Sequence, residues 1–184
     1  MHNVLLALWF FAPAGVANMM PVFVAKMPVL KNWNAPMDGG KSYRGIRIFG
    51  SHKTWRGFIA GIIFATITLG IQQVLVIHQP WAANFTKSIS YRTLPTLVVG
   101  PLFGIGALGA DAIESFFKRQ RRIPPGHGWF PFDQSDYVVG GALATAPYVR
   151  LSIMEYVWLL VLWLAASLLA SYIGFKLGFK ERPI

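Results

Sequence analysis

The stretch GIGALGADAIESFFKRQRRIPPGHGWFPFDQSD, residues 104–136, begins inside an apolar run and ends in a basic segment rich in proline and glycine. It holds Asp111, Glu114, Asp133 and Asp136, which are four of the seven acidic residues in the chain. Carboxylates are costly in an apolar protein, so the place where they gather is the best guide to its chemistry. We therefore predict the fold and the site outward from this stretch.

The composition is that of a membrane protein. The chain has 184 residues, of which 54% are hydrophobic and 13% are charged, and its mean hydropathy is +0.47. In soluble domains about a quarter of the residues are charged. We therefore expect a single all-α integral membrane domain over residues 1–184, a bundle of about five transmembrane helices. The absence of cysteine excludes disulfides, zinc thiolate sites and cysteine nucleophiles.

Apolar runs near the length of about 20 residues that crosses a bilayer core predict the spans. One run, residues 137–149, is short for a crossing. The predicted spans are residues 3–25, 57–78, 94–117, 137–149 and 152–173. The third span is rich in glycine, so neighbouring helices can approach it closely. Its glycines, together with a first span kinked by prolines, are expected to form a lateral opening for a lipid.

The cations predict the topology. The formal net charge is +10, and the basic residues concentrate in residues 26–56, residues 118–136 and the C-terminal tail. Five crossings place all three segments on one side, which the positive-inside rule makes cytoplasmic, with the N-terminus outside. We expect a multi-pass protein of the cell membrane whose site faces the cytoplasm. Contact with membrane lipids also fits this charge, whereas nucleic acid is not an expected partner because the cations lie between spans.

A polar stripe is predicted on the third span. If residues 111–119 are helical, Asp111, Glu114, Ser115 and Lys118 share one face at i, i+3, i+4 and i+7. Such a stripe at the end of a membrane helix should face a wet cleft lined by protein. The competing interpretation is a solvated Glu114–Lys118 ion pair. That pair leaves Asp111, one turn deeper, unexplained.

Three carboxylates near one membrane face suggest a metal site. Asp133 and Asp136 form a second pair at i,i+3, for which capping of the next helix is the competing interpretation. Together with Asp111 they offer hard oxygen ligands that suit Mg²⁺ and substrate phosphates. Cations on the same side complete a pattern for phosphoryl chemistry on a lipid phosphate, although such residues can also serve only topology and lipid contact. These cations are Lys53, Arg56, Lys118 and Arg119.

Several motifs occur in a characteristic order. Ser115-Phe-Phe-Lys-Arg119, Pro-Gly-His-Gly128 and Asp133-Gln-Ser-Asp136 together resemble the signature of the membrane CTP:lipid-phosphate cytidylyltransferases. Asp38-Gly-Gly-Lys41 and Lys53-Thr-Trp-Arg-Gly57 are similar to the small CDP-archaeol synthase branch of that family. The resemblance covers the whole chain, and it includes the small size and the five-span topology.

The resemblance implies transfer of the cytidylyl group from CTP to an isoprenoid ether glycerol-1-phosphate lipid, giving CDP-archaeol and pyrophosphate. It implies Mg²⁺ held by Asp111, Asp133 and Asp136, with these residues and Lys118 catalytic. A loop histidine such as His127 more often donates a hydrogen bond or stacks on a partner than acts as an acid or base. The implied substrate-binding residues are Lys53, Thr54, Arg56, Ser115, Arg119, Gly126 and His127.

Three other functions remain open from the sequence. A cytidylyltransferase for diacyl phosphatidate is the nearest alternative. A small channel or transporter subunit and a scaffold that binds anionic lipid are more distant. Binding of CTP with Mg²⁺ would distinguish the enzymes from both of these.

Overall fold

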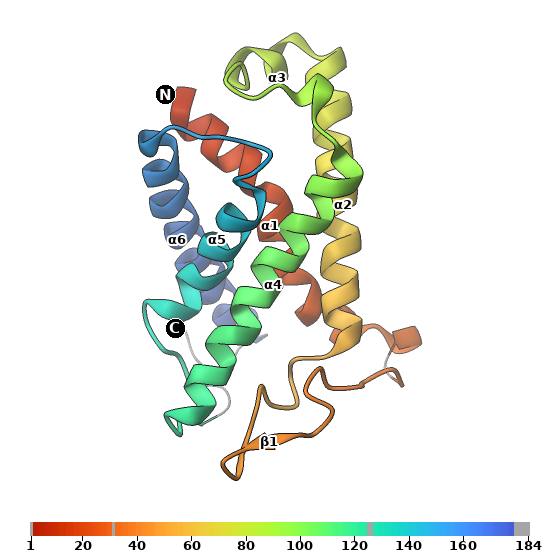
Figure 1. Cartoon of the computed structure of the whole chain (residues 1–184). Coiled ribbons are helices and arrows are strands. Elements are labelled where there is room, and N and C mark those ends of the chain that lie inside the picture. Colours follow the sequence, from red (N-terminus) through yellow and green to blue (C-terminus); the bar gives the residue numbers. More distant parts are fainter. Residues whose placement is uncertain (1, 31, 125–126, 179–184) are drawn as a thin grey trace.

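The protein is a bundle of helices with connections at both ends (Figure 1). The computed structural model describes residues 2–30, 32–124 and 127–178. Its longer helices are α1 (His2–Lys26), α2 (Trp55–His78), α4 (Thr96–Gln120), α5 (Phe132–Thr145) and α6 (Ile153–Lys176). The smaller elements are η1 (Pro28–Leu30), β1 (Ser42–Tyr43), β2 (Ile46–Arg47), α3 (Pro80–Phe85) and η2 (Tyr91–Thr93). The prediction of an all-α membrane protein is confirmed, apart from one hairpin of two short strands.

In the part of the chain that the structure describes, four helices are long and apolar enough to cross a membrane: α1, α2, α4 and α6. The outer face of α2 shows why lipid is the right solvent. Ile63, Ile67 and Ile71 lie at i, i+4 and i+8 and are 50%, 49% and 56% exposed. An exposed isoleucine stripe of this kind is unfavourable in water and favourable against acyl chains.

Helix α5 returns the chain between α4 and α6, so that α1, α4 and α6 run one way and α2 and α5 run the other (Figure 1). The predicted crossing at residues 137–149 is displaced, because α5 begins at Phe132 and ends at Thr145. Pro131 and Pro147 flank this helix, and proline is disfavoured inside one. With 14 residues, α5 is about 21 Å long, shorter than the ~30 Å hydrocarbon core. It therefore does not count among the four candidate spans.

Glycines bring α4 against both of its neighbours. A Cβ atom at Gly100 or Gly104 would stand 2.6 Å from the Cα atom of Thr66 or Ile62 on α2. A Cβ atom at Gly106 would meet the backbone of Gly140 on α5. The close approach predicted for this span is confirmed. At these three glycines the neighbouring helices fill the space of the predicted lateral opening. At Gly109 an added Cβ atom meets nothing within 4 Å, so the opening stays a prediction there.

The polar loop between α1 and α2 lies at the end of the bundle where α4 also ends (Figure 1). Its hairpin pairs Ser42 with Arg47 and Tyr43 with Ile46. Arg44 and Gly45 turn the chain with φ angles of 52° and 76°, as a two-residue hairpin turn of type I′ requires. Thr54 then caps α2, its hydroxyl accepting from the Gly57 N–H at 3.4 Å. Polar residues of this loop and of α4 are thereby brought to one place.

Candidate active site

Two lysine–carboxylate pairs join three separate parts of the chain at this end of the bundle. Lys53, from the loop before α2, places its Nζ atom 2.6 Å from both carboxylate oxygens of Asp111 on α4. Lys118, two turns further along α4, donates to the carboxylate of Asp133 on α5 at 2.7 and 3.0 Å. Three of these four side chains belong to the motifs that the sequence analysis singled out. Their long-range pairing fixes the loop, α4 and α5 around one site.

A cluster of three carboxylates lies between these pairs. Asp111, Glu114 and Asp136 each offer an oxygen, and these oxygens all lie within 4.8 Å of one another. Glu114 is buried, whereas Asp111 and Asp136 are half-buried. Carboxylate oxygens at this spacing are suited to a hard divalent cation. The described part of the chain therefore contains a group that can hold a metal ion.

Asp133, the third metal ligand expected from the resemblance, has a different environment. In addition to Lys118, its carboxylate accepts a hydrogen bond from the backbone N–H of Trp129 at 2.7 Å, and it shares a hydrogen bond with Glu114. It lies on the first turn of α5, whose N-cap residue is Pro131. Asp133 therefore belongs to the site without being the N-cap, and it borders the three-carboxylate cluster through Glu114.

The polar stripe predicted on α4 faces the interior. Glu114, Ser115 and Lys118 are 8%, 7% and 9% exposed, respectively, and the side chain of Asp111 is 23% exposed. The competing interpretation, a solvated Glu114–Lys118 ion pair, is confirmed for the pair but wrong about its solvation, because both side chains are buried. Those two groups are 3.9 Å apart, and Lys118 lies closer to Asp133. The stripe is thus the wall of a polar site.

The charge of Lys53 is set by opposing effects. Burial disfavours the charged amine, but the carboxylate of Asp111 outweighs this and raises the pKa of Lys53 above its ordinary value. Asp136 and Glu114 act in the same direction. Lys53 is therefore a firmly charged ammonium in a group where carboxylates outnumber lysines. Additional positive charge would be favourable there.

Arg56 and Thr54, both predicted to contact substrate, have structural partners. The guanidinium of Arg56 is buried and donates from Nη1 to the Leu30 carbonyl at 2.8 Å. Thr54 is buried as the N-cap of α2. The Arg56 contact ties the start of α2 to the beginning of the loop that follows α1. Lys53 is therefore the residue of the Lys53–Arg56 motif that lies against the carboxylates, whereas Thr54 and Arg56 have structural partners.

The remaining predicted residues lie around the end of α4. Arg119 donates to the Pro124 carbonyl at 3.4 Å, and its Nε atom is buried with no hydrogen-bond partner among the residues that the structure describes. The backbone N–H of His127 also donates to the Pro124 carbonyl, at 3.3 Å. Gly126 lies outside the described residues.

Glu114 is the site residue that the sequence analysis left out of the predicted ligands. Its place on the polar stripe of α4, at i+3 from Asp111, is predicted from the sequence, but the predicted metal ligands are Asp111, Asp133 and Asp136. The signal that could identify Glu114 as a ligand is its position on α4 relative to Asp111. A carboxylate on the same face as Asp111, within one turn of it, shares its environment.

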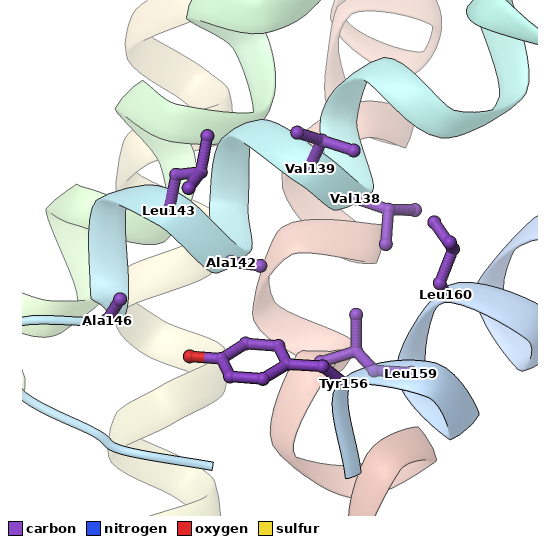
Figure 2. A pocket seen from close by; sticks show the side chains of 8 residues that line it. All are labelled: Val138, Val139, Ala142, Leu143, Ala146, Tyr156, Leu159 and Leu160. Atoms are coloured by element: carbon purple, nitrogen blue, oxygen red, sulfur yellow. The ribbon is translucent and has the colours of Figure 1, made fainter. Parts of the chain in front are cut away.

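An apolar groove of about 340 Å³ lies between α5 and α6. Figure 2 shows the side chain of Tyr156, on α6, extending toward α5. The α5 wall begins at Val138, two positions after Asp136, and continues away from the carboxylates. None of the lysines or carboxylates of the polar site is among the residues that line the groove. It is lined by Val138, Val139, Ala142, Leu143, Ala146, Tyr156, Leu159 and Leu160.

Comparison with known proteins gives one consistent result. The family model described as CarS-like, CDP-archaeol synthase, matches residues 1–184. A CDP-archaeol synthase of Pyrococcus furiosus is 32% identical over 184 residues, which covers 100% of this chain and 99% of the relative. One of Methanospirillum hungatei is 34% identical over 173 residues, covering 90% of this chain and 99% of the relative.

A solved structure agrees with this result. It is described as an intramembrane enzyme for archaeal membrane lipid biosynthesis, and it superposes with a TM-score of 0.68 at 25% identity. The match covers 91% of this chain and 93% of the solved one. Sequence and fold therefore agree over nearly the whole chain. The chain belongs to the CDP-archaeol synthase family, and it is an enzyme of the nucleotidyltransferase class.

Proposed function

We propose that this enzyme transfers the cytidylyl group of CTP to an isoprenoid ether glycerol-1-phosphate lipid, giving CDP-archaeol and pyrophosphate. The observation that carries the proposal is the arrangement of three carboxylates within 4.8 Å of one another, flanked by Lys53 and Lys118. Carboxylates can hold a divalent ion while lysines bind phosphate oxygens, and phosphoryl-transfer sites combine these two functions. Membership of the family supports the choice of CTP and an archaeal lipid.

The residues present fit Mg²⁺. Asp111, Glu114 and Asp136 supply only oxygen donors, which this hard cation prefers, and substrate phosphates and water can complete its coordination. Bound there, the ion would neutralise phosphate oxygens and favour departure of pyrophosphate. Asp133 stays with Lys118 in this arrangement. It orients the lysine rather than serving as a ligand.

The two lysines bind and orient the triphosphate. Each is paired with a carboxylate, Lys53 with Asp111 and Lys118 with Asp133. A polyanionic triphosphate offers each lysine stronger partners, whereas the excess of carboxylates repels it. CTP binding is therefore expected to be weak without a divalent ion. Lys53 and Lys118 approach from different elements, so together they can hold the nucleotide with its α-phosphorus exposed to attack.

The lipid phosphate enters from the membrane side. In this proposal its isoprenoid chain occupies the groove between α5 and α6, which is lined by apolar side chains and whose α5 wall starts two positions after Asp136 in the sequence (Figure 2). Its phosphate oxygen then attacks the α-phosphorus of CTP. A new P–O bond forms to the lipid phosphate, and the bond between the α-phosphorus and its bridging oxygen breaks as pyrophosphate leaves. A phosphate is already a nucleophile at neutral pH, so no general base is required.

The site faces the cytoplasm of a cell-membrane protein in this proposal. Cations are frequent at the end of the bundle that holds the site: the loop between α1 and α2, which lies there (Figure 1), contains Lys41 and Arg47, and Arg121 follows α4 as its C-cap. The positive-inside rule places that end in the cytoplasm, where CTP is available. The opposite end then faces outward with the start of α1.

A liposome assay tests the function. Purified protein is incubated with labelled CTP, Mg²⁺ and equal amounts of the geranylgeranyl ether lipid phosphate and diacyl phosphatidate. The expected product is the CDP-lipid of the ether substrate, formed in preference to the ester product and lost on chelation of the metal. Absence of any CDP-lipid would refute the activity, and preferential use of phosphatidate would refute the proposed lipid.

A further inference from the structure

The carboxylate of Asp38 is a centre of hydrogen bonding in the loop between α1 and α2. Its Oδ1 atom accepts from the Gly40 N–H at 2.9 Å, and its Oδ2 atom accepts from the Phe49 and Gly50 N–H groups at 3.1 and 3.0 Å. Arg47 adds two bonds of 3.2 Å, from Nη2 to Oδ1 and from Nε to Oδ2. The Asp38 side chain is 0% exposed. These contacts hold both ends of segment 38–50 to a single carboxylate.

The backbone of Lys53 is hydrogen-bonded to the residue that precedes Asp38. The Lys53 carbonyl accepts from the N–H of Met37, the neighbour of Asp38, at 2.8 Å. One residue on, the Trp55 N–H donates to the Ala35 carbonyl at 3.0 Å, and Pro36 bridges to Thr54. On its other side Lys53 follows Gly50 by only three positions. The contacts of Asp38 therefore determine the position of the backbone at Lys53.

Lys53 depends on such support because it precedes α2. It lies outside any helix or strand, and a lysine side chain has many accessible rotamers. Its Nζ atom nevertheless contacts both oxygens of Asp111, across 58 positions of sequence. A displacement of the loop by about 1 Å would break this geometry, and misplacement of that size can cost up to about a hundredfold in rate.

We infer that Asp38 is a positioning residue. By closing segment 38–50 it places Lys53 against Asp111 and, if the proposed function holds, against the triphosphate of CTP. Asp38 does not act as a metal ligand, because five donors already occupy its oxygens and its side chain is fully buried. It acts on the site through Lys53.

The first experiment measures the position of Lys53 without any substrate. The Asp38→Asn variant replaces an acceptor oxygen by an amide NH₂ group, which cannot accept from the loop N–H groups. The readout is the acetylation rate of Lys53 by a water-soluble reagent, from peptide mass spectrometry, relative to Lys87 at the opposite end. We expect acetylation of Lys53 to become roughly fivefold faster or more, because the pair with Asp111 opens more often. An unchanged rate would overturn the inference.

Two further variants keep this experiment decisive. Arg44→Gln changes an exposed cation of the same hairpin that does not contact Asp38, and it should leave Lys53 protected. If Asp38→Asn does not fold, Arg47→Gln removes the guanidinium and keeps the carboxylate with its three backbone donors. Partial loss of protection at Lys53 is then expected, and full protection contradicts the inference.

The second experiment measures whether Asp38 acts through Lys53. Binding of CTP with Mg²⁺ is compared in the parent protein, Asp38→Asn, Lys53→Met and the double variant. Asp38→Asn should weaken binding roughly tenfold in the parent and have little further effect when Lys53 is already Met, as expected for coupled residues. Equal weakening in both backgrounds would show an independent role. If the parent protein does not bind CTP, the proposed function fails, while the acetylation experiment still decides the role of Asp38.

Discussion

The contact between Gly106 and Gly140 determines how closely the two helices that carry the carboxylates approach. Asp111 and Glu114 lie on α4, and Asp136 lies on α5, one turn before Gly140. In Gly106→Ala the new Cβ atom would stand 2.6 Å from the Cβ atom of Ala144 and would also meet the Gly140 carbonyl. Carbon atoms pack at about 3.5–4.0 Å, so the helices must separate by about 1 Å.

That separation is large compared with the tolerance of a metal site, in which ligand distances hold to about ±0.2 Å. We therefore expect the Mg²⁺ concentration for half-maximal cytidylyl transfer to rise at least about tenfold in Gly106→Ala. Overpacking should also destabilise the protein by about 1–3 kcal/mol, partly offset by the better helix propensity of alanine, about 1 kcal/mol. Mg²⁺ titration in liposomes measures the first effect, and thermal unfolding in detergent measures the second.

Gly109 provides the matched control on the same helix. A Cβ atom added there meets nothing within 4 Å, so Gly109→Ala should leave the Mg²⁺ dependence unchanged and slightly raise the unfolding temperature. If Gly106→Ala and Gly109→Ala show the same Mg²⁺ dependence, the approach of α4 to α5 does not control the metal site. The assignment of Asp136 as a ligand together with Asp111 and Glu114 would then be refuted.

Three further predictions concern individual side chains. Glu114→Gln should raise the Mg²⁺ concentration for half-maximal cytidylyl transfer by about tenfold or more in the same titration. An unchanged titration would exclude Glu114 as a ligand. Arg56→Met should lower the unfolding temperature and leave the KM for CTP unchanged, because its guanidinium binds the Leu30 carbonyl. Burial raises the pKa of Asp38, but hydrogen bonds from Arg47 and backbone N–H groups outweigh it, lowering the pKa from 3.8 to about 2. The lowered pKa of Asp38 contributes about 2 kcal/mol to the free energy of unfolding above pH 3.8, and this contribution is lost as the pH falls through about 2. The acid dependence of the free energy of unfolding should therefore be shallower in Asp38→Asn.

The helices and their polar face could be predicted because both depend on local sequence. Runs of apolar residues predicted the four long helices to within a few residues at each end. The spacing of Asp111, Glu114 and Lys118 predicted one face of α4, since helical periodicity fixes which side chains share a face. The glycines of α4 predicted close packing for the same reason. Each of these inferences needs only the geometry of a single helix.

Partner choice could not be predicted, because it depends on how helices are placed relative to one another. Lys118 has Glu114 one turn away on its own helix, yet it pairs with Asp133, 15 positions along the chain. The start of α5 at Phe132 brings Asp133 within reach, and the sequence analysis had placed that residue in a loop. Arg56 similarly looks like a phosphate ligand beside Lys53, but its side chain reaches Leu30. Sequence patterns identify which groups carry charge, and tertiary contacts decide which charge each one meets.

The site also explains why carboxylates and lysines occur together in so apolar a chain. A carboxylate at the end of a membrane bundle is costly unless it is paired, and a cluster poised for a cation carries that cost whenever no cation is bound. Lys53 and Lys118 reduce it by neutralising Asp111 and Asp133, each from a different element. The same lysines are then in place for a polyanionic substrate that arrives with a divalent ion. The two lysines therefore neutralise carboxylates and are also placed to bind substrate, so substitution of either lysine should affect both stability and nucleotide binding.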